Sequence, residues 1–218
     1  MLIPPKPLSY YEKKNLQKQF EEDCLDELKY NQEKYQHQTE SRFSDIEQSV
    51  LWSCLNDKIG DDLHSRLNSI VNKNLTMDVS VELYRGLSRR EAARWEFSEV
   101  GDIIEFERVL SFSHDYSIAK QFASAYTYGT FCMFAIRNCP IAFNYQEVMH
   151  TMVMGAPDSE FLKGFNEQHD RLDKLTMIKD ECEWMLPIGS KFRVVDVDLL
   201  SADPFQREVT IIYLESII

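Results

Sequence analysis

The segment Glu181-Cys182-Glu183-Trp184-Met185-Leu186-Pro187 alternates two carboxylates with bulky apolar residues. Side chains alternate between the two faces of a β-strand, which rises about 3.3 Å per residue. As a strand, the segment would carry Glu181 and Glu183 on one face, roughly 6–7 Å apart. We therefore expect a strand that is held by its apolar face and presents paired carboxylates to a ligand. A solvated face of an edge strand is the ordinary alternative, although Met185 beside the carboxylates fits it poorly.

Composition and charge describe an ordinary acidic globular protein. The 218 residues are 44% hydrophobic and 28% charged, which suits one compact domain with an appendage. The formal net charge of −12 argues against binding a phosphate backbone over a broad face, so we expect no direct nucleic-acid binding. An acidic surface attracts basic proteins, although solubility alone also accounts for such a charge.

Cysteine and histidine usage gives no sign of a disulfide framework or a metal site. The chain has 5 cysteines without a CxxC pair and 5 histidines without ligand spacing. The N-terminal stretch Met1–Pro7 is too short and too rich in proline for a signal peptide, and no apolar run approaches a membrane span. We expect a reduced, soluble, cytoplasmic protein without a metal or a membrane partner.

The first third of the chain has the pattern of helices. Residues 9–40 contain no glycine or proline and repeat apolar side chains at four-residue spacing, which predicts one amphipathic helix lying across a core. Ser44 and Glu47 fit a capping box that begins a second helix, and Gly60 ends it. A third helix follows up to about residue 74.

The rest of the chain reads as short strands with intervening helices. We expect helices at 116–126 and 145–154, and the polar segment 155–174 reads as a long loop. This order predicts an α+β fold, with residues 1–76 as a helical region packed on a core of residues 77–218 in one compact domain. The expected strands are Val81–Tyr84, Ile103–Phe112, Thr130–Ile136, Ile141–Tyr145, Glu181–Leu186, Phe192–Val197 and Val209–Leu214.

Two further motifs carry groups that suit a nucleotide. Arg85 and Gly86 end an early strand, where an arginine can hold a diphosphate through parallel hydrogen bonds and a glycine allows close approach to its backbone. Ser111 and Ser113 share one face of a later strand and offer hydroxyls to a ribose or a carboxylate. Taken singly, the first motif is equally a surface arginine before a turn, and the second a half-exposed strand.

The order and spacing of the three motifs resemble the Arg-Ser-Glu class of ADP-ribosyltransferases. The stretches Phe43–Leu75 and Ala142–Glu147 are similar to the small Mod-type mono-ADP-ribosyltransferases of T-even-like bacteriophages, and the resemblance runs from about Phe43 to the C-terminus. The middle threonine of the family's Ser-Thr-Ser motif is replaced by Phe112, which points away from the ligand face.

This resemblance implies a fold and a reaction. The fold would be a split β-sandwich core preceded by N-terminal helices. The enzyme would cleave NAD+, its co-substrate, and transfer ADP-ribose to an arginine of a host protein in the transcription or translation machinery during phage infection. It would act in the host cytoplasm, with carriage in the virion left open, and it would need no metal.

The resemblance also implies roles for the acidic pair. Glu183 matches the catalytic glutamate, which would bond the ribose 2′-hydroxyl and stabilise an oxocarbenium-like transition state. Glu181 matches the upstream glutamate that binds and deprotonates an incoming guanidinium, and arginine is normally fully protonated. The segment Leu172–Asp180, expected to be a loop, would meet the target protein.

The NAD-binding residues implied by the resemblance lie on the other two motifs. Arg85 would hold the phosphates, the Gly86 backbone would read the carboxamide, Ser111 would position the nicotinamide ribose and Glu183, and Ser113 would support them. An aromatic residue should stack on the nicotinamide, and the candidates are Phe122, Tyr126 and Tyr128.

Three other functions share parts of this pattern. An NAD glycohydrolase would lack the protein acceptor, and Glu181 argues against it. An inactive NAD-fold module could bind a host protein through its N-terminal helices. A glycosidase also uses two carboxylates, about 5–5.5 Å apart in retaining enzymes. Release of nicotinamide rather than sugar separates the transferase from the glycosidase, and NAD binding without turnover would indicate the inactive module.

Overall fold

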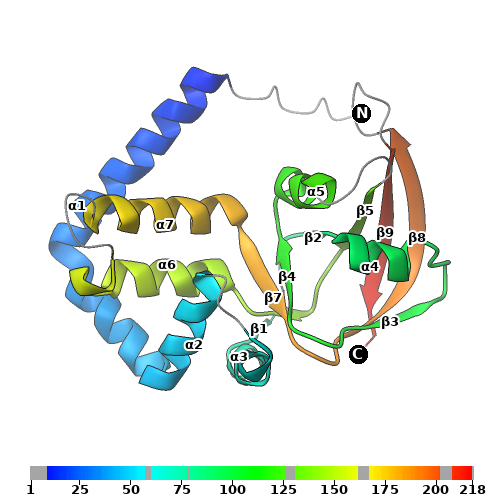
Figure 1. Cartoon of the computed structure of the whole chain (residues 1–218), viewed down its shortest axis with the longest axis horizontal. Coiled ribbons are helices and arrows are strands. Elements are labelled where there is room, and N and C mark those ends of the chain that lie inside the picture. Colours follow the sequence, from blue (N-terminus) through cyan, green and yellow to red (C-terminus); the bar gives the residue numbers. More distant parts are fainter. Residues whose placement is uncertain are drawn as a thin grey trace.

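A helical half and a curled β-sheet lie side by side in the computed structural model, with α5 and α4 packed on the sheet (Figure 1). The structure describes residues 9–56, 60–77, 79–125, 131–161, 167–201 and 208–217. Two of the three candidate stacking residues, Tyr126 and Tyr128, lie outside the described residues.

The elements follow one another in a helical, then mixed, order that confirms the α+β class. The helices are α1 (Tyr10–Arg42), α2 (Asp45–Leu55), α3 (Asp61–Lys73), α4 (Arg89–Trp95), α5 (Tyr116–Ala125), α6 (Tyr145–Gly155), the 3-10 helix η1 (Asp158–Glu160) and α7 (Glu167–Glu181). The strands are β1 (Thr76–Met77), β2 (Leu83–Gly86), β3 (Ile103–Glu105), β4 (Leu110–Ser113), β5 (Phe131–Ile136), β6 (Ile141–Ala142), β7 (Glu183–Leu186), β8 (Lys191–Ser201) and β9 (Glu208–Ser216).

The N-terminal helices begin where the sequence predicts. The side chain of Ser44 caps α2 together with Glu47 in the expected capping box, and α1 has a second box, formed by Ser9 and Glu12. Helix α1 lies across α6 and α7 as one long helix (Figure 1). In the described part of the chain, no helix is long and apolar enough to cross a membrane.

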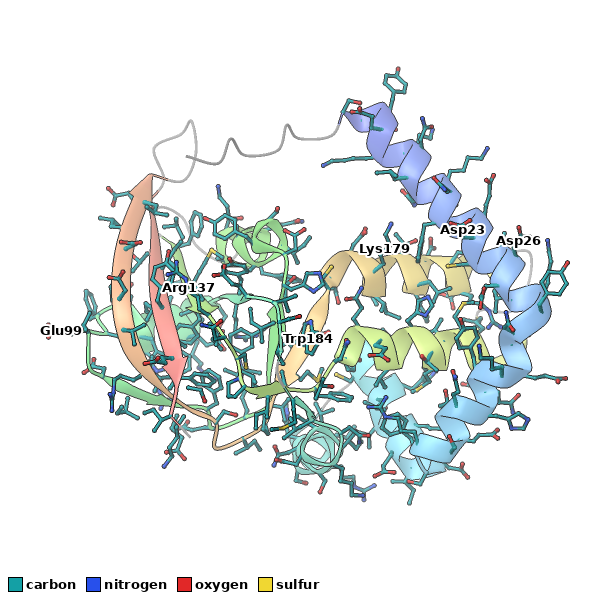
Figure 2. The ribbon with its side chains drawn as sticks, turned by 180° about the vertical axis from the view of Figure 1, so that it is seen from behind. Asp23, Asp26, Glu99, Arg137, Lys179 and Trp184 are labelled. Carbon is teal, nitrogen blue, oxygen red and sulfur yellow. The ribbon has the colours of Figure 1, made fainter. Side chains whose placement is uncertain are left out.

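The helical half has its own apolar core, and β7 reaches into it. Buried side chains of α2, α3, α6 and α7 form this core, and Met185 of β7 joins them. On the outside, Lys179 of α7 points toward α1, where its ammonium lies 4.4 Å from the ring centre of Phe20 (Figure 2). Strand β7 is therefore packed against helices on one face and shares the sheet core through the other.

The large sheet curls around a second, aromatic core. Its seven strands are ordered β3-β8-β9-β5-β2-β4-β7, so β3 and β7 are its edges. Phe106, which follows β3, nevertheless lies 5.9 Å from the ring of Phe112 on β4 and 6.2 Å from that of Phe134 on β5. Its backbone also bonds Ser190 and Gly189, beyond β7. Strands at the two ends of the order therefore face one another across one core.

Two predictions for the C-terminal half are wrong. The expected strand Glu181–Leu186 is interrupted, because α7 runs to Glu181, Cys182 has a positive φ of 51°, and β7 begins at Glu183. The expected loop 155–174 contains the first half of α7, while residues 162–166 lie outside the described part. The helix is explained by Leu172, Leu175 and Ile178, spaced three apart, which turn to the helical core.

The strands were otherwise placed with shifted ends. The expected strand Ile103–Phe112 is divided into β3 and β4, and Ile141–Tyr145 shortens to β6 because α6 begins at Tyr145. Helix α4 was not anticipated, although Ser88 and Glu91 form the capping box that begins it.

The packing of α6 on α1 depends on Gly155, and this gives a test of the helical half. A Cβ atom at Gly155 would lie 2.5 Å from the backbone nitrogen of Gln36 and 2.7 Å from the carbonyl carbon of Tyr35. Since backbone atoms of a helix move only together, Gly155→Ala should lower the free energy of unfolding by about 1–3 kcal/mol. Gly60→Ala, which meets no atom within 4 Å, is the matched control. Urea unfolding of both variants measures the difference, and equal stability would contradict the close approach.

Candidate functional site

Every described residue that was predicted to bind or act on the dinucleotide lines one cleft between the sheet, α5 and the end of α7. Its volume is about 440 Å³, within the range of small-molecule sites. Distant parts of the chain meet there, among them β2 with α4, β4 with α5, and α7 with β7. The predicted residues on its wall are Arg85, Gly86, Ser111, Ser113, Phe122, Glu181 and Glu183.

Arg85 lies where two strands part. Within the described residues, β2 and β4 pair at one position, Tyr84 opposite Ser113. Beyond that pair, the Nη1 of Arg85 donates to the backbone carbonyl of Ser111 at 2.7 Å. The Nη2 donates to Oε1 of Glu91 at 2.8 Å, and the Nε–H is buried without a partner among the described groups. The guanidinium is thus fixed in place by both of its Nη groups.

Glu91 is a site residue that sequence reasoning missed. Its side chain is only 8% exposed and accepts from both Arg85 and Arg108, each 2.8 Å from Oε1. Its Oε2 accepts from the backbone N–H of Ser88 at 2.9 Å. Burial raises the pKa of Glu91, but the Arg85 charge and the hydrogen bonds outweigh it and lower the pKa to about 2. The capping pattern marked this residue, whereas its arginine partners could not be read from the sequence.

Ser111 and Ser113 of β4 make different hydrogen bonds. The register of β4 with β7 sets Ser113 opposite Glu183 and Ser111 opposite Met185, so these side chains share one face. The hydroxyl of Ser113 accepts from the backbone N–H of Asp115 at 3.0 Å and thereby shapes the turn into α5. Ser111 is anchored through its backbone by Arg85, as described above.

The two glutamates reach the cleft from different elements, which corrects the expected single strand face. Glu181 is the last residue of α7, and Glu183 is the first residue of β7. The intervening Cys182 turns the chain with its left-handed backbone, and its carbonyl accepts from the N–H of His114 at 3.2 Å. This turn ties the carboxylates to the end of β4, so both still line the same cleft.

Tyr145 and Cys54 form part of the cleft wall together with the carboxylates, and neither was predicted. Tyr145 begins α6 and is 3% exposed. Burial raises the pKa of Tyr145 well above its ordinary value, and nearby Cys54, Glu183 and Glu181 raise it further. Its hydroxyl therefore stays protonated beside two acidic groups. The sequence offered no signal for this role, because the contact of Tyr145 with the carboxylates joins elements that are far apart in the chain.

Gly86 and Phe122 connect the cleft to α5. A Cβ atom at Gly86 would lie 2.1 Å from the carbonyl oxygen of Ala119 and 2.4 Å from the nitrogen of Ala123, so α5 itself makes the close approach to this glycine. Phe122 projects from α5, lines the cleft and is 46% exposed. Its ring is accessible for stacking on a flat ligand.

The cleft has groups of opposite charge at two places along β4. Arg85, Arg108 and Glu91 gather near Ser111, whereas Glu183 lies opposite Ser113. Two residues of a strand span about 7 Å, the scale of one sugar ring. Such a site can hold an anionic group beside a developing cation. Among the described residues, no three His, Cys, Asp or Glu side chains are grouped as metal ligands would be.

Comparison with known proteins gives a family. The model of the bacteriophage T4 Mod ADP-ribosyltransferases matches residues 13–213, so the similarity begins within α1, earlier than the sequence resemblance suggested. The NAD–protein ADP-ribosyltransferase modB of Enterobacteria phage T4 is 34% identical over 160 residues, covering 72% of this chain and 75% of modB. The modA enzyme of the same phage is 33% identical over 153 residues, covering 70% and 72%.

A solved structure agrees with the fold. The ADP-ribosyltransferase Vis, a toxin from Vibrio splendidus, aligns over 99% of this chain and 89% of its own with a TM-score of 0.51 and 14% identity. At this identity the likeness bears on the fold alone. It confirms the expected ADP-ribosyltransferase-like core with helices before it.

The buried ion pairs of Glu91 predict an acid-dependent loss of stability. Because the folded pKa of about 2 lies below the ordinary value of 4.5, the stabilisation is complete above about pH 4.5 and is lost as the pH falls toward 2. The shift corresponds to about 3 kcal/mol. The unfolding free energy of wild type should therefore exceed that of Glu91→Gln at pH 7, with the gap shrinking between pH 4.5 and 2.

Glu107→Gln is the control for this measurement, since Glu107 pairs with Arg94 in an exposed position where solvent screens the interaction. Its difference from wild type should be the smaller one. A gap for Glu91→Gln that stays constant with pH would contradict the ion-pair assignment.

Proposed function

The chain belongs to the bacteriophage T4 Mod ADP-ribosyltransferase family, and we propose that it transfers ADP-ribose from NAD+ to arginine side chains of host proteins. The observation that carries the proposal is the meeting of Arg85, Ser111 and Glu183 on the wall of one cleft, although they lie on separate strands. The names of the T4 relatives support NAD+ and protein as the two substrates.

Arg85 and Ser111 are the binding groups in this proposal. The guanidinium of Arg85 is already fixed by Ser111 and Glu91, so it binds a diphosphate without losing further side-chain freedom. The hydroxyl of Ser111 bonds the nicotinamide ribose, and Phe122 stacks on the nicotinamide ring. Gly86 offers its backbone to the carboxamide, and Ser113 supports the turn that holds the strand.

Glu183 acts on the sugar. The bond between the ribose C1′ and the nicotinamide nitrogen breaks, and the electron pair leaves with nicotinamide. Positive charge then develops on the ribose, and the Glu183 carboxylate stabilises it while accepting from the 2′-hydroxyl. The hydroxyl of Tyr145 stays protonated and therefore adds no negative charge beside the two carboxylates.

Glu181 acts on the acceptor. It takes a proton from the arriving guanidinium, whose nitrogen then forms the new bond to C1′. The position of Glu181 at the end of the 15-residue α7 favours a cation there, since a helix C-terminus carries partial negative charge. Met177 of α7 also lines the cleft and is 37% exposed, which gives the aliphatic part of an arginine a surface to pack on.

The site of contact with the target is revised by the fold. The segment Leu172–Asp180 belongs to α7, so we propose that the end of a helix, rather than a loop, meets the host protein. The net charge of −12 favours a basic target. We propose a protein of the host transcription or translation machinery as that target. The reaction takes place in the host cytoplasm and uses no metal.

The whole proposal is tested by labelled NAD+. The purified enzyme, incubated with 32P-NAD+ and host lysate, should label host proteins, and mass spectrometry should place ADP-ribose on arginine side chains. Glu183→Gln should fold normally and label at least about 100-fold more slowly, because the charge that stabilises the transition state is lost. Labelling of other side chains would overturn the arginine assignment, and wild-type rates for Glu183→Gln would overturn the role of Glu183.

Glu181→Gln separates transfer from hydrolysis. Transfer to agmatine, a small guanidinium acceptor, should fall by about 100-fold or more, whereas slow release of nicotinamide to water should persist. Asp180→Asn is the matched control, because this neighbouring carboxylate does not belong to the cleft wall. Equal loss of both reactions in Glu181→Gln would contradict the acceptor role, and full transfer without Glu181 would favour a different base.

A further inference from the structure

Two arginines share one carboxylate at the edge of the cleft. Arg85 and Arg108 each donate from Nη2 to Oε1 of Glu91 at 2.8 Å. Two positive charges against one negative charge leave this cluster with an excess of one positive charge. The excess is notable in a chain of net charge −12, because an acidic surface gives such a cluster no general reason to form.

The cluster is layered from the interior to solvent. The side chain of Glu91 is 8% exposed, that of Arg85 is 17% exposed, and that of Arg108 is 53% exposed. All three line the cleft. The buried Nε–H of Arg85 lacks a partner among the described groups, and a buried donor without an acceptor is costly. An anion against the exposed side of this cluster would balance its excess positive charge.

We propose that Arg108 is a second binding group for the diphosphate of the dinucleotide, and that Glu91 holds the guanidinia of Arg85 and Arg108 side by side. Guanidinium groups match phosphate oxygens with paired hydrogen bonds, and a diphosphate offers two adjacent phosphates. The shared carboxylate sets the spacing of the two arginines before the ligand arrives, so little freedom is lost on binding. The inference deepens the proposed function and rests on it, because the ligand is taken to be NAD+ or its ADP-ribose part.

Neighbouring arginines do not offer the same geometry. Arg94 on α4 is engaged by both carboxylate oxygens of Glu107, at 2.8 and 2.9 Å, and it is not part of the cleft wall. It has the same side chain and charge as Arg108, and its partner Glu107 precedes Arg108 in the chain. Arg94 is therefore a matched control.

The experiment is a titration of the purified full chain with ADP-ribose, in which isothermal calorimetry measures the dissociation constant. Arg108→Ala should raise the dissociation constant of ADP-ribose about 10- to 100-fold, the scale of losing charged hydrogen bonds, and Arg108→Lys should lie between it and wild type. Arg94→Ala should bind as wild type does. The dependence of the dissociation constant on salt should also become shallower in Arg108→Ala, which a merely structural loss would not produce.

The outcomes separate this inference from the proposed function. ADP-ribose binding by Arg108→Ala within about twofold of wild type, or an equal loss in Arg94→Ala, would overturn the role of Arg108. Tight ADP-ribose binding that depends on Arg108, in a wild-type enzyme that transfers nothing to protein, would overturn the proposed transferase and leave the diphosphate clamp standing. A wild-type chain that fails to bind ADP-ribose would overturn both.

Discussion

The cleft depends on the guanidinium of Arg85 where β2 and β4 part. Two strands that separate leave backbone groups without partners, and a buried carbonyl without a donor is costly. Arg85 donates to the carbonyl of Ser111, so a side chain supplies the hydrogen bond that a neighbouring strand would otherwise make. Glu91 accepts from the same guanidinium and neutralises it within the wall. The separation of β2 from β4 therefore also fixes the position of the Arg85 guanidinium in the cleft.

A second constraint is the turn at Cys182, which couples the helical half to the sheet. Phe143 and Met185 exchange backbone hydrogen bonds of 2.9 Å, so the start of α6 is tied to β7 just below the carboxylates. Because α7 ends at the same turn, a shift of the helical half would move Glu181 relative to Glu183. The N-terminal helices thus share in shaping the site through the core they form with α6, α7 and Met185.

The sequence anticipated which residues meet in the cleft better than it anticipated the path of the chain. Arg85, Ser111 and Glu183 were identifiable because each belongs to a short motif with a fixed order. The alternation around Cys182 resembles a strand in the sequence, whereas the chain ends α7 at Glu181 and turns at Cys182 with a left-handed φ of 51°. Glu91 and Arg108 were not predicted, because their roles arise from a contact between α4 and the segment before β4 that local pattern does not encode.

The positions of the charged groups along β4 bear on how the cleft would favour bond cleavage in the proposed reaction. The arginine cluster near Ser111 and the carboxylate opposite Ser113 are separated by about two residues of strand, roughly 7 Å. A ligand that is anionic at one end and becomes cationic at the other gains from both, and it gains more as its bond breaks. Binding at the arginine end alone would stabilise substrate and transition state equally. In the proposed reaction, the acidic end, fixed by the α7–β7 turn, is what makes the cleft favour the broken bond.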